Sequence, residues 1–137
     1  MTAKEYLRRY KEINDSINCR LDEIAKLREL ATRLSPTAKF DRSGNVSDKV
    51  GRSVAKIVDL ETEIDREVDE LVETRRDMMQ MISRLDNADM QLILEMRYTA
   101  MFSWSQIAEK MHCKKTKIFE LHGKALIFVE KLLTKTE

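Results

Sequence analysis

Apolar residues follow a helical period through the first quarter of the chain. From Tyr6 onward they recur mostly every three or four positions, which places them on one face of a helix. Thr2 can cap this helix, because Glu5 stands at the reciprocal position of a capping box. Pro36 is expected to end it, because proline has no N–H to continue the hydrogen-bond ladder. The pattern therefore predicts a helix over residues 3–34.

A second stretch has a seven-residue period. Its apolar positions include Ile57, Ile64, Leu71, Met78 and Leu85. A period of seven sustained over this length is typical of a coiled-coil seam. With Ser47 as N-cap, the pattern predicts a helix over residues 48–85. Residues 36–47 contain the single proline and one of the three glycines, and they are expected to form the connecting loop.

The two long helices are expected to fold back on each other as an antiparallel hairpin. One hairpin has little core depth, so a second hairpin or another chain is expected to cover its apolar surface. The prediction is therefore a coiled-coil hairpin over residues 1–85 that makes the protein a homo-oligomer, with a dimer favoured.

The pattern changes after residue 85, where three shorter helical segments follow. Asp86 or Asn87 can cap the first, which runs to Tyr98. Ser103 can cap the second, over 104–111, with Gln106 completing a capping box.

After a short break at His112-Cys113-Lys114, a third segment is expected over 115–133. A short helix, a tight turn and a longer second helix are the layout of a helix-turn-helix. The sequence thus predicts an all-α protein with a three-helix, helix-turn-helix module over residues 86–137.

Composition supports helices throughout. Charged residues make up 36% of the chain, while glycine occurs three times and proline once. Two cysteines are too few for a secreted disulfide framework, and no apolar run resembles a signal peptide or a membrane span. We expect a cytoplasmic protein that does not enter a membrane.

The net charge of +1 does not indicate that the chain as a whole binds nucleic acid, but the charge of one segment favours such binding. Between residues 110 and 124, five lysines accompany a single glutamate, a net charge of +4. Three of them, Lys114, Lys115 and Lys117, stand at the start of the second helix of the pair, whose first residues reach base edges in DNA-binding helix-turn-helix proteins. The pattern favours DNA binding, although lysines that only keep a helix pair in solution would look similar.

No pattern points to catalysis or to a cofactor. The acidic residues between Asp59 and Glu73 are expected to form a solvated outer face of the second helix, and no histidine lies near them. His112, Cys113 and His122 do not have the spacing of a closed zinc site. We expect no catalytic site, no metal and no cofactor, and therefore no enzyme.

Three single residues carry further expectations. Cys113 is expected to be a small buried residue in the turn, and His122 to be partly exposed or next to a phosphate. Gly123 lowers the stability of its helix, so a close approach to the first helix of the module or to DNA is expected there.

The stretch "LDNADMQLILEMRYTAMFSWSQIAEKMHCKKTKIFELHGKAL" resembles region 4 of bacterial sigma-70-type factors. The whole chain resembles phage transcriptional regulators of the RinA and ArpU kind, through "MTAKEYLRRYKEIN" and "SDKVGRSVAKIVDLETEID" as well. This resemblance implies a phage or prophage regulator in a bacterial host cell that binds specific double-stranded DNA and contacts host RNA polymerase.

Carried over by position, the resemblance assigns base-facing places to Lys115, Thr116, Lys117 and Glu120. It assigns phosphate-side places to Trp104 and Lys124. Lys114 belongs to the same DNA-binding set, although it stands where the family has a serine cap. His112 stands where the family has a glycine.

Two other functions remain open at this point. A phage DNA-packaging recognition subunit of the small-terminase kind also combines a helix-turn-helix with helical oligomerisation. A helical adaptor would use the same helix pair to dock a protein and would never bind DNA.

Overall fold

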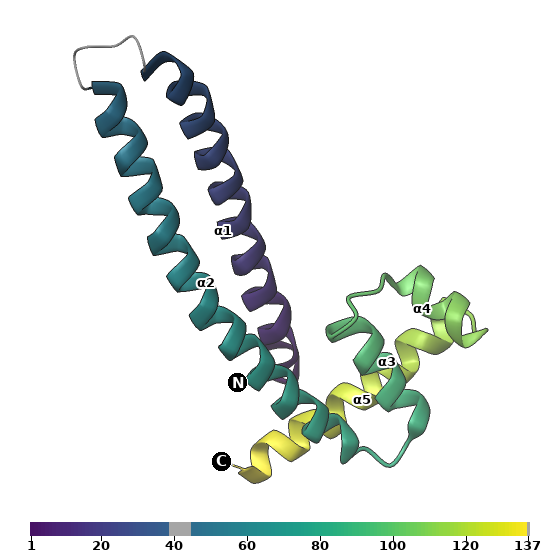
Figure 1. Cartoon of the computed structure of the whole chain (residues 1–137). Coiled ribbons are helices and arrows are strands. Elements are labelled where there is room, and N and C mark those ends of the chain that lie inside the picture. The colour runs from purple at the N-terminus through teal and green to yellow at the C-terminus, as the bar shows by residue number, and fades with distance from the viewer. Residues whose placement is uncertain (39–44, 137) are drawn as a thin grey trace. The chain divides into compact units, whose positions relative to one another are not determined.

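The computed structural model describes residues 1–38 and 45–136, and the chain is all-helical over these residues (Figure 1). The five helices are α1 (Ala3–Ala38), α2 (Asn45–Ser83), α3 (Ala88–Tyr98), α4 (Trp104–Met111) and α5 (Lys115–Thr136). None of the described helices is both long and apolar enough to cross a membrane.

Helix starts agree with the predicted caps wherever a cap lies among the described side chains. Glu5 N–H donates to Thr2 Oγ1 (3.2 Å) and Thr2 N–H donates to Glu5 Oε2 (3.0 Å), so the predicted capping box is confirmed. At the start of α3, Asn87 Oδ1 accepts a hydrogen bond from Met90 N–H at 3.0 Å.

The predicted boundaries between the two long helices were wrong. α1 continues through Pro36 to Ala38, and α2 begins at Asn45, so Ser47 lies inside α2 instead of capping it. Proline removes a single N–H donor, and one missing bond within the last turn does not stop the backbone from completing that turn. The rest of the predicted connection, residues 39–44, lies outside the described residues.

Residues 14–70 form one compact unit, in which α1 and α2 run antiparallel. Its core consists of Ile24, Ile57 and Leu60, with Leu27 and Ile64 packed against them. Across this core, Arg20 bonds both Glu63 (2.6 Å) and Glu67, and Arg28 bonds Glu61 (2.8 Å).

Two of the acidic residues therefore do not lie where they were expected. Glu63 and Glu67 are partly buried beside the α1–α2 contact and do not form part of a free outer face. Residues that flank an apolar seam can reach the neighbouring helix, and Arg20 provides the opposite charge there. Hydrogen bonds from Ser16 and Arg20 lower the pKa of Glu67.

The second compact unit combines both ends of the chain. It comprises residues 1–13 and the segment from Leu71 to the C-terminus. One core joins all five helices, and its largest fully buried side chains are Leu7, Met78, Ile93, Leu94, Ile107, Ile118 and Val129. The division expected at residue 85 does not coincide with these units, because the start of α1 and the end of α2 pack into the same core as α3, α4 and α5.

The seven-residue period of α2 matches its buried face. Ile57 and Met78 are buried, while Ile64 and Leu71 are partly buried; Leu85, the last position of the period, lies just after α2 and is also buried. Several other apolar side chains of the long helices are exposed, and within residues 14–70 they are Leu21, Leu30, Val54, Val58 and Val68.

Candidate functional site

α4 begins at a complete cap and is held against α5. Ser103 N–H donates to Gln106 Oε1 (2.8 Å), and Gln106 N–H donates to Ser103 Oγ (3.2 Å), which confirms the predicted capping box. Ile107 and Ala108 are buried, and α5 packs against both α3 and α4. The capped start and the buried face of α4 thus fix where α5 begins.

The turn between α4 and α5 requires an unusual backbone conformation. His112 has φ 55° and ψ 39°, in the left-handed region, and its N–H donates to the carbonyls of Ala108 and Glu109. This region costs a residue with a Cβ about 1–2 kcal/mol, although histidine enters it more often than most side chains do. His112 therefore occupies the position where glycine is the least costly residue.

Cys113 is exposed, so the expectation that it is buried was wrong. The left-handed residue before it turns the chain outward, and its thiol lies 3.3 Å from the carbonyl oxygen of Met111. Its backbone N–H, which donates to the carbonyl of Ala108 at 3.0 Å, contributes to the turn instead.

The first turn of α5 presents a run of basic side chains to solvent. Lys114, Lys115, Thr116 and Lys117 are all exposed, and among the described residues no carboxylate lies within ion-pair distance of the three lysines. Ile118, directly after them, is fully buried and anchors the turn to the core. We call Lys114, Lys115 and Lys117, together with Thr116, the α5 cationic turn.

Glu120 and Lys124 are brought together, one turn apart on α5. Lys124 Nζ lies 3.2 Å from Glu120 Oε1, and both side chains are more than half exposed. Such a pair within a helix is worth only about 0.3–0.5 kcal/mol, so it can open readily when a ligand competes for either group. The resemblance gave Glu120 a base-facing place and Lys124 a phosphate-side place, but in the free protein the two charges neutralise each other.

Trp104 is partly buried at the start of α4 and makes contacts on several sides. The guanidinium carbon of Arg97 lies 4.3 Å from the centre of its ring. The rings of Phe119 and His122 lie edge-on to it, with centroid distances of 5.3 and 4.6 Å. Trp104 therefore connects the surface of α4 to α5 and to Arg97 on α3.

His122 is buried, so the expectation of a partly exposed residue or a phosphate neighbour was wrong. Its Nε2 lies 2.7 Å from the hydroxyl of Tyr98, and the ring is stacked with Tyr98 and packed against Trp104. Burial, together with the nearby positive charges of Lys4 and Arg97, lowers the pKa of His122 to about 4. The imidazole is thus neutral at physiological pH and makes an internal hydrogen bond.

Gly123 is not close to any other part of the described chain. A Cβ added there would meet no other heavy atom within 4 Å. The predicted close approach to α3 is therefore wrong, and the expected approach to DNA stays a prediction.

Two residues beside the α5 cationic turn were missed in the sequence. Phe119 is 47% exposed, and Arg97 lies over Trp104. The inward positions of Ile118 and Leu121 place Phe119 outside by helical periodicity, so this signal was present in the pattern. The contact between Arg97 and Trp104 joins α3 to α4, so no pattern within a short stretch of the sequence indicates it.

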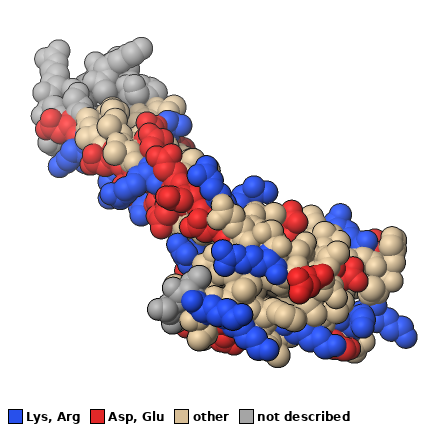
Figure 2. Space-filling view, turned by 90° about the horizontal axis from the view of Figure 1, so that it is seen from below, with Lys and Arg blue, Asp and Glu red and all other residues tan. Residues whose placement is uncertain are grey.

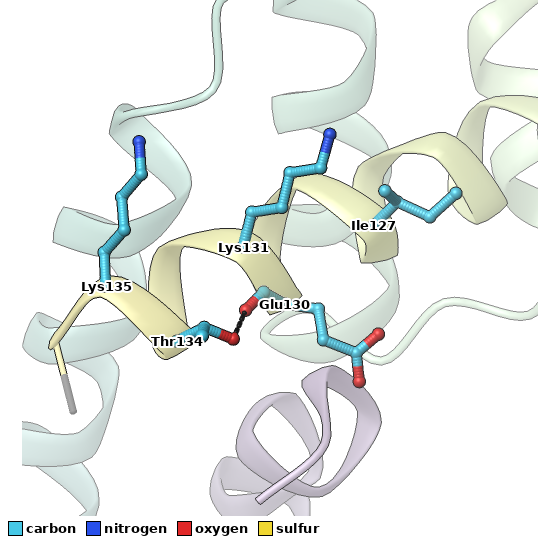
Figure 3. A pocket seen from close by; sticks show the side chains of 5 residues that line it. All are labelled: Ile127, Glu130, Lys131, Thr134 and Lys135. Carbon is cyan, nitrogen blue, oxygen red and sulfur yellow. Dashed lines mark hydrogen bonds between the residues drawn. The ribbon is translucent and has the colours of Figure 1, made fainter.

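The described residues contain no group of three or more histidine, cysteine or acidic side chains that could hold a metal ion. A shallow hollow lies on the last turns of α5, where Ile127, Glu130, Lys131, Thr134 and Lys135 line it (Figure 3). All five come from one helix, and the amino groups of Lys131 and Lys135 extend to one side while the carboxylate of Glu130 extends to another (Figure 3). The polar groups do not converge on a point, so this hollow has no features of a catalytic site.

Charge is mixed on the face drawn in Figure 2. Acidic side chains gather there along part of the α1–α2 pair, and basic side chains are spread between them and the uncharged areas. The α5 cationic turn differs from this mixture because three exposed lysines stand within four successive positions, and none of them has a carboxylate partner in the described part of the chain.

A family model described as a protein of unknown function, DUF1492, matches residues 37–130, which is more than half of the chain. No curated protein and no solved structure matches the chain.

Proposed function

The chain belongs to the DUF1492 family of proteins of unknown function, and from its own surface we propose that it is a sequence-specific, DNA-binding transcription regulator. In this proposal α4 and α5 are a helix-turn-helix, and the α5 cationic turn enters the major groove of double-stranded DNA. The resemblance to sigma region 4 and to phage regulators supports the same function. On that basis the protein is encoded by a phage or prophage and contacts host RNA polymerase.

The observation on which the proposal rests is the α5 cationic turn. Lysines in the first turn of a helix are unfavourable for the helix dipole, whose positive end is there. Three of them, exposed and without carboxylate partners, suit an external polyanion that compensates both the lysines and the dipole. The buried Ile118 holds this turn in place, so the cations are presented on a fixed surface.

Affinity and sequence preference would come from different side chains. In this proposal Lys115 and Lys117, to which the resemblance assigns base-facing places, contact phosphates together with Lys114 and supply affinity, because each contact releases counterions from the duplex. Thr116 and Glu120 face the same side of α5 at a spacing of four residues and can reach base edges. Glu120 must leave Lys124 to accept from a cytosine amino group, which frees Lys124 for a phosphate.

We propose that the α1–α2 pair is an oligomerisation hairpin. Exposed Val54, Val58 and Val68 support this, because unpaired apolar side chains on a long helix are commonly covered by another chain. A dimer would place two α5 helices on two half-sites of one duplex.

A protein-interaction adaptor is the second candidate. Ile127 and Phe128, on the later turns of α5, are 56% and 44% exposed, and an adaptor would use them to dock another protein. A DNA-packaging subunit is the third candidate. It would assemble as a ring, whose mass in solution differs from that of a dimer.

Reversing two charges of the α5 cationic turn tests the proposed function. We expect Lys115→Glu/Lys117→Glu to weaken binding to a mixed-sequence 30-base-pair duplex at least tenfold, since two phosphate contacts become repulsive. The slope of log affinity against log salt should fall by about two. Fluorescence anisotropy over a salt series measures both quantities.

The control is Lys26→Glu/Lys49→Glu, which makes the same change in net charge at exposed positions of α1 and α2. It should leave the salt slope unchanged. Equal losses in both double variants would mean that net charge alone governs binding. No binding by the unaltered protein at low salt would reject DNA binding and favour the adaptor.

A further inference from the structure

Phe119 is an exposed aromatic residue beside the α5 cationic turn. Its side chain is 47% exposed. It follows Lys115 by four positions and Thr116 by three, and residues at these spacings share one side of a helix. Single exposed apolar residues are common on protein surfaces, so exposure alone assigns no role.

The ring of Phe119 is held in place by a chain of contacts that reaches the core. It lies edge-on to Trp104, at 5.3 Å between centroids and 73° between planes. Trp104 in turn lies edge-on to His122, whose Nε2 is 2.7 Å from the hydroxyl of buried Tyr98. Because the ring is already held in place, the Phe119 side chain loses little conformational entropy when a ligand binds against it.

The surroundings of Phe119 indicate what kind of ligand suits it. The cores of protein–protein interfaces are depleted in lysine, whereas Lys115, four positions before Phe119, lies on the same side of α5 as this ring. A polyanion that also presents a small apolar group fits both features. Among the base pairs of duplex DNA, only those with thymine present a methyl group in the major groove.

We propose that Phe119 contacts the C5-methyl group of a thymine in the major groove and makes the protein prefer thymine at that position. This inference rests on the proposed function, since it requires α5 to lie in the groove. Stacking on an unpaired base is the other use of an aromatic residue among cations. The convex surface of a helix favours the duplex, because the major groove is wide enough to admit a helix.

Replacing thymine by uracil removes only the methyl group and tests the contact directly. The preferred site is first selected by the unaltered protein from a library of 30-base-pair duplexes with a random centre. Each thymine of that duplex is then replaced singly by uracil, and affinities are measured by anisotropy. At one or two positions we expect uracil to weaken binding roughly fourfold, as burial of one methyl group implies.

Variants assign this preference to a side chain. Phe119→Ala should bind the thymine and uracil duplexes equally, whereas Phe119→Leu, which keeps an apolar side chain and the fold, should retain part of the preference. Phe128→Ala is the matched control, because Phe128 is an exposed phenylalanine of the same helix, 44% exposed. It should keep the whole preference.

Different failures have different meanings. If Phe119→Ala keeps the full thymine preference, or if no thymine matters while Lys115→Glu/Lys117→Glu still weakens binding at least tenfold, the inference is wrong and the proposed function stands. Tighter binding to the single strand than to the duplex overturns the groove contact. If no duplex binds at all, the proposed function fails together with the inference.

Discussion

At the scale of single residues, the buried imidazole of His122 links stability to pH. Its pKa is about 4 in the folded protein against an ordinary value of 6.5, so between these values the unfolded chain binds more protons than the folded one. Stability contributed by the neutral imidazole is therefore present above pH 6.5 and is lost as pH falls toward 4. The loss can reach about 3 kcal/mol.

We expect His122→Gln to remove this part of the pH dependence, because glutamine does not titrate but can still bond the hydroxyl of Tyr98. Urea unfolding of both proteins at pH 7.5, 6 and 5 gives the difference between their free energies of unfolding at each pH. The titration of the carboxylates cancels in this difference, because both proteins have the same carboxylates. An equally steep fall in the variant would show that another group is responsible.

His112 and Cys113 show what could and could not be predicted for single residues. The resemblance indicated that a glycine belongs at position 112, and the left-handed backbone there gives the physical reason. The exposure of Cys113 and the burial of His122 depend on how the turn directs the chain and on Tyr98, which lies on another helix. A local pattern contains neither piece of information.

At the scale of helices, the start of α5 illustrates a conflict between stability and the proposed function. Lys114 directly precedes the helix. Its ammonium group cannot accept a hydrogen bond, so it cannot cap the first N–H groups of α5. We expect Lys114→Ser to raise the free energy of unfolding by about 1 kcal/mol, because a serine hydroxyl can accept one of these bonds.

The same substitution should weaken duplex binding and lower the salt slope by about one, since one phosphate contact is lost. Thermal unfolding and anisotropy on the same samples measure the two effects. A gain in stability with unchanged DNA binding would remove Lys114 from the interface and leave Lys115 and Lys117 in place.

Helix positions were predicted well where the signal is local. The cap at Ser103 and the ranges of α4 and the start of α5 agree with the sequence, because capping boxes and apolar spacing act within a few residues. The boundary near Pro36 was misplaced, because one missing donor is a weaker signal than the helix around it. Phe119 was not predicted, because the base-facing positions that the resemblance implies all hold polar side chains here.

At the scale of the whole molecule, the proposal requires that copies associate through the α1–α2 pair. We expect a solution mass of twice 16.1 kDa by analytical ultracentrifugation. Val58→Glu/Val68→Glu should shift the protein toward monomer, because it places charges on exposed apolar positions that a partner would bury.

The control is Ala25→Glu/Ala55→Glu, which adds the same charge at exposed positions without removing large apolar side chains. It should remain a dimer. A monomeric parent protein would reject the oligomerisation role of the hairpin, and a ring of many copies would favour the packaging function.

The sequence pattern alone does not specify how the five helices divide into compact units. The seven-residue period identified the buried face of α2, yet Leu7 and Met78 share a core with Ile93 and Ile107. Which helix ends join which core depends on contacts between residues far apart in the chain, and a periodic pattern does not specify them.

The central claim, that the start of α5 lies against DNA, can be measured with the two native cysteines. Cys113 precedes the α5 cationic turn, Cys19 lies on α1, and both are exposed. Iron–EDTA is attached to Cys113 in a Cys19→Ser variant, and to Cys19 in a Cys113→Ser variant. Cleavage of the bound duplex is then mapped on a sequencing gel. We expect strong, localised cleavage from Cys113 and little from Cys19. Equal cleavage from both positions, or stronger cleavage from Cys19, would contradict the claim.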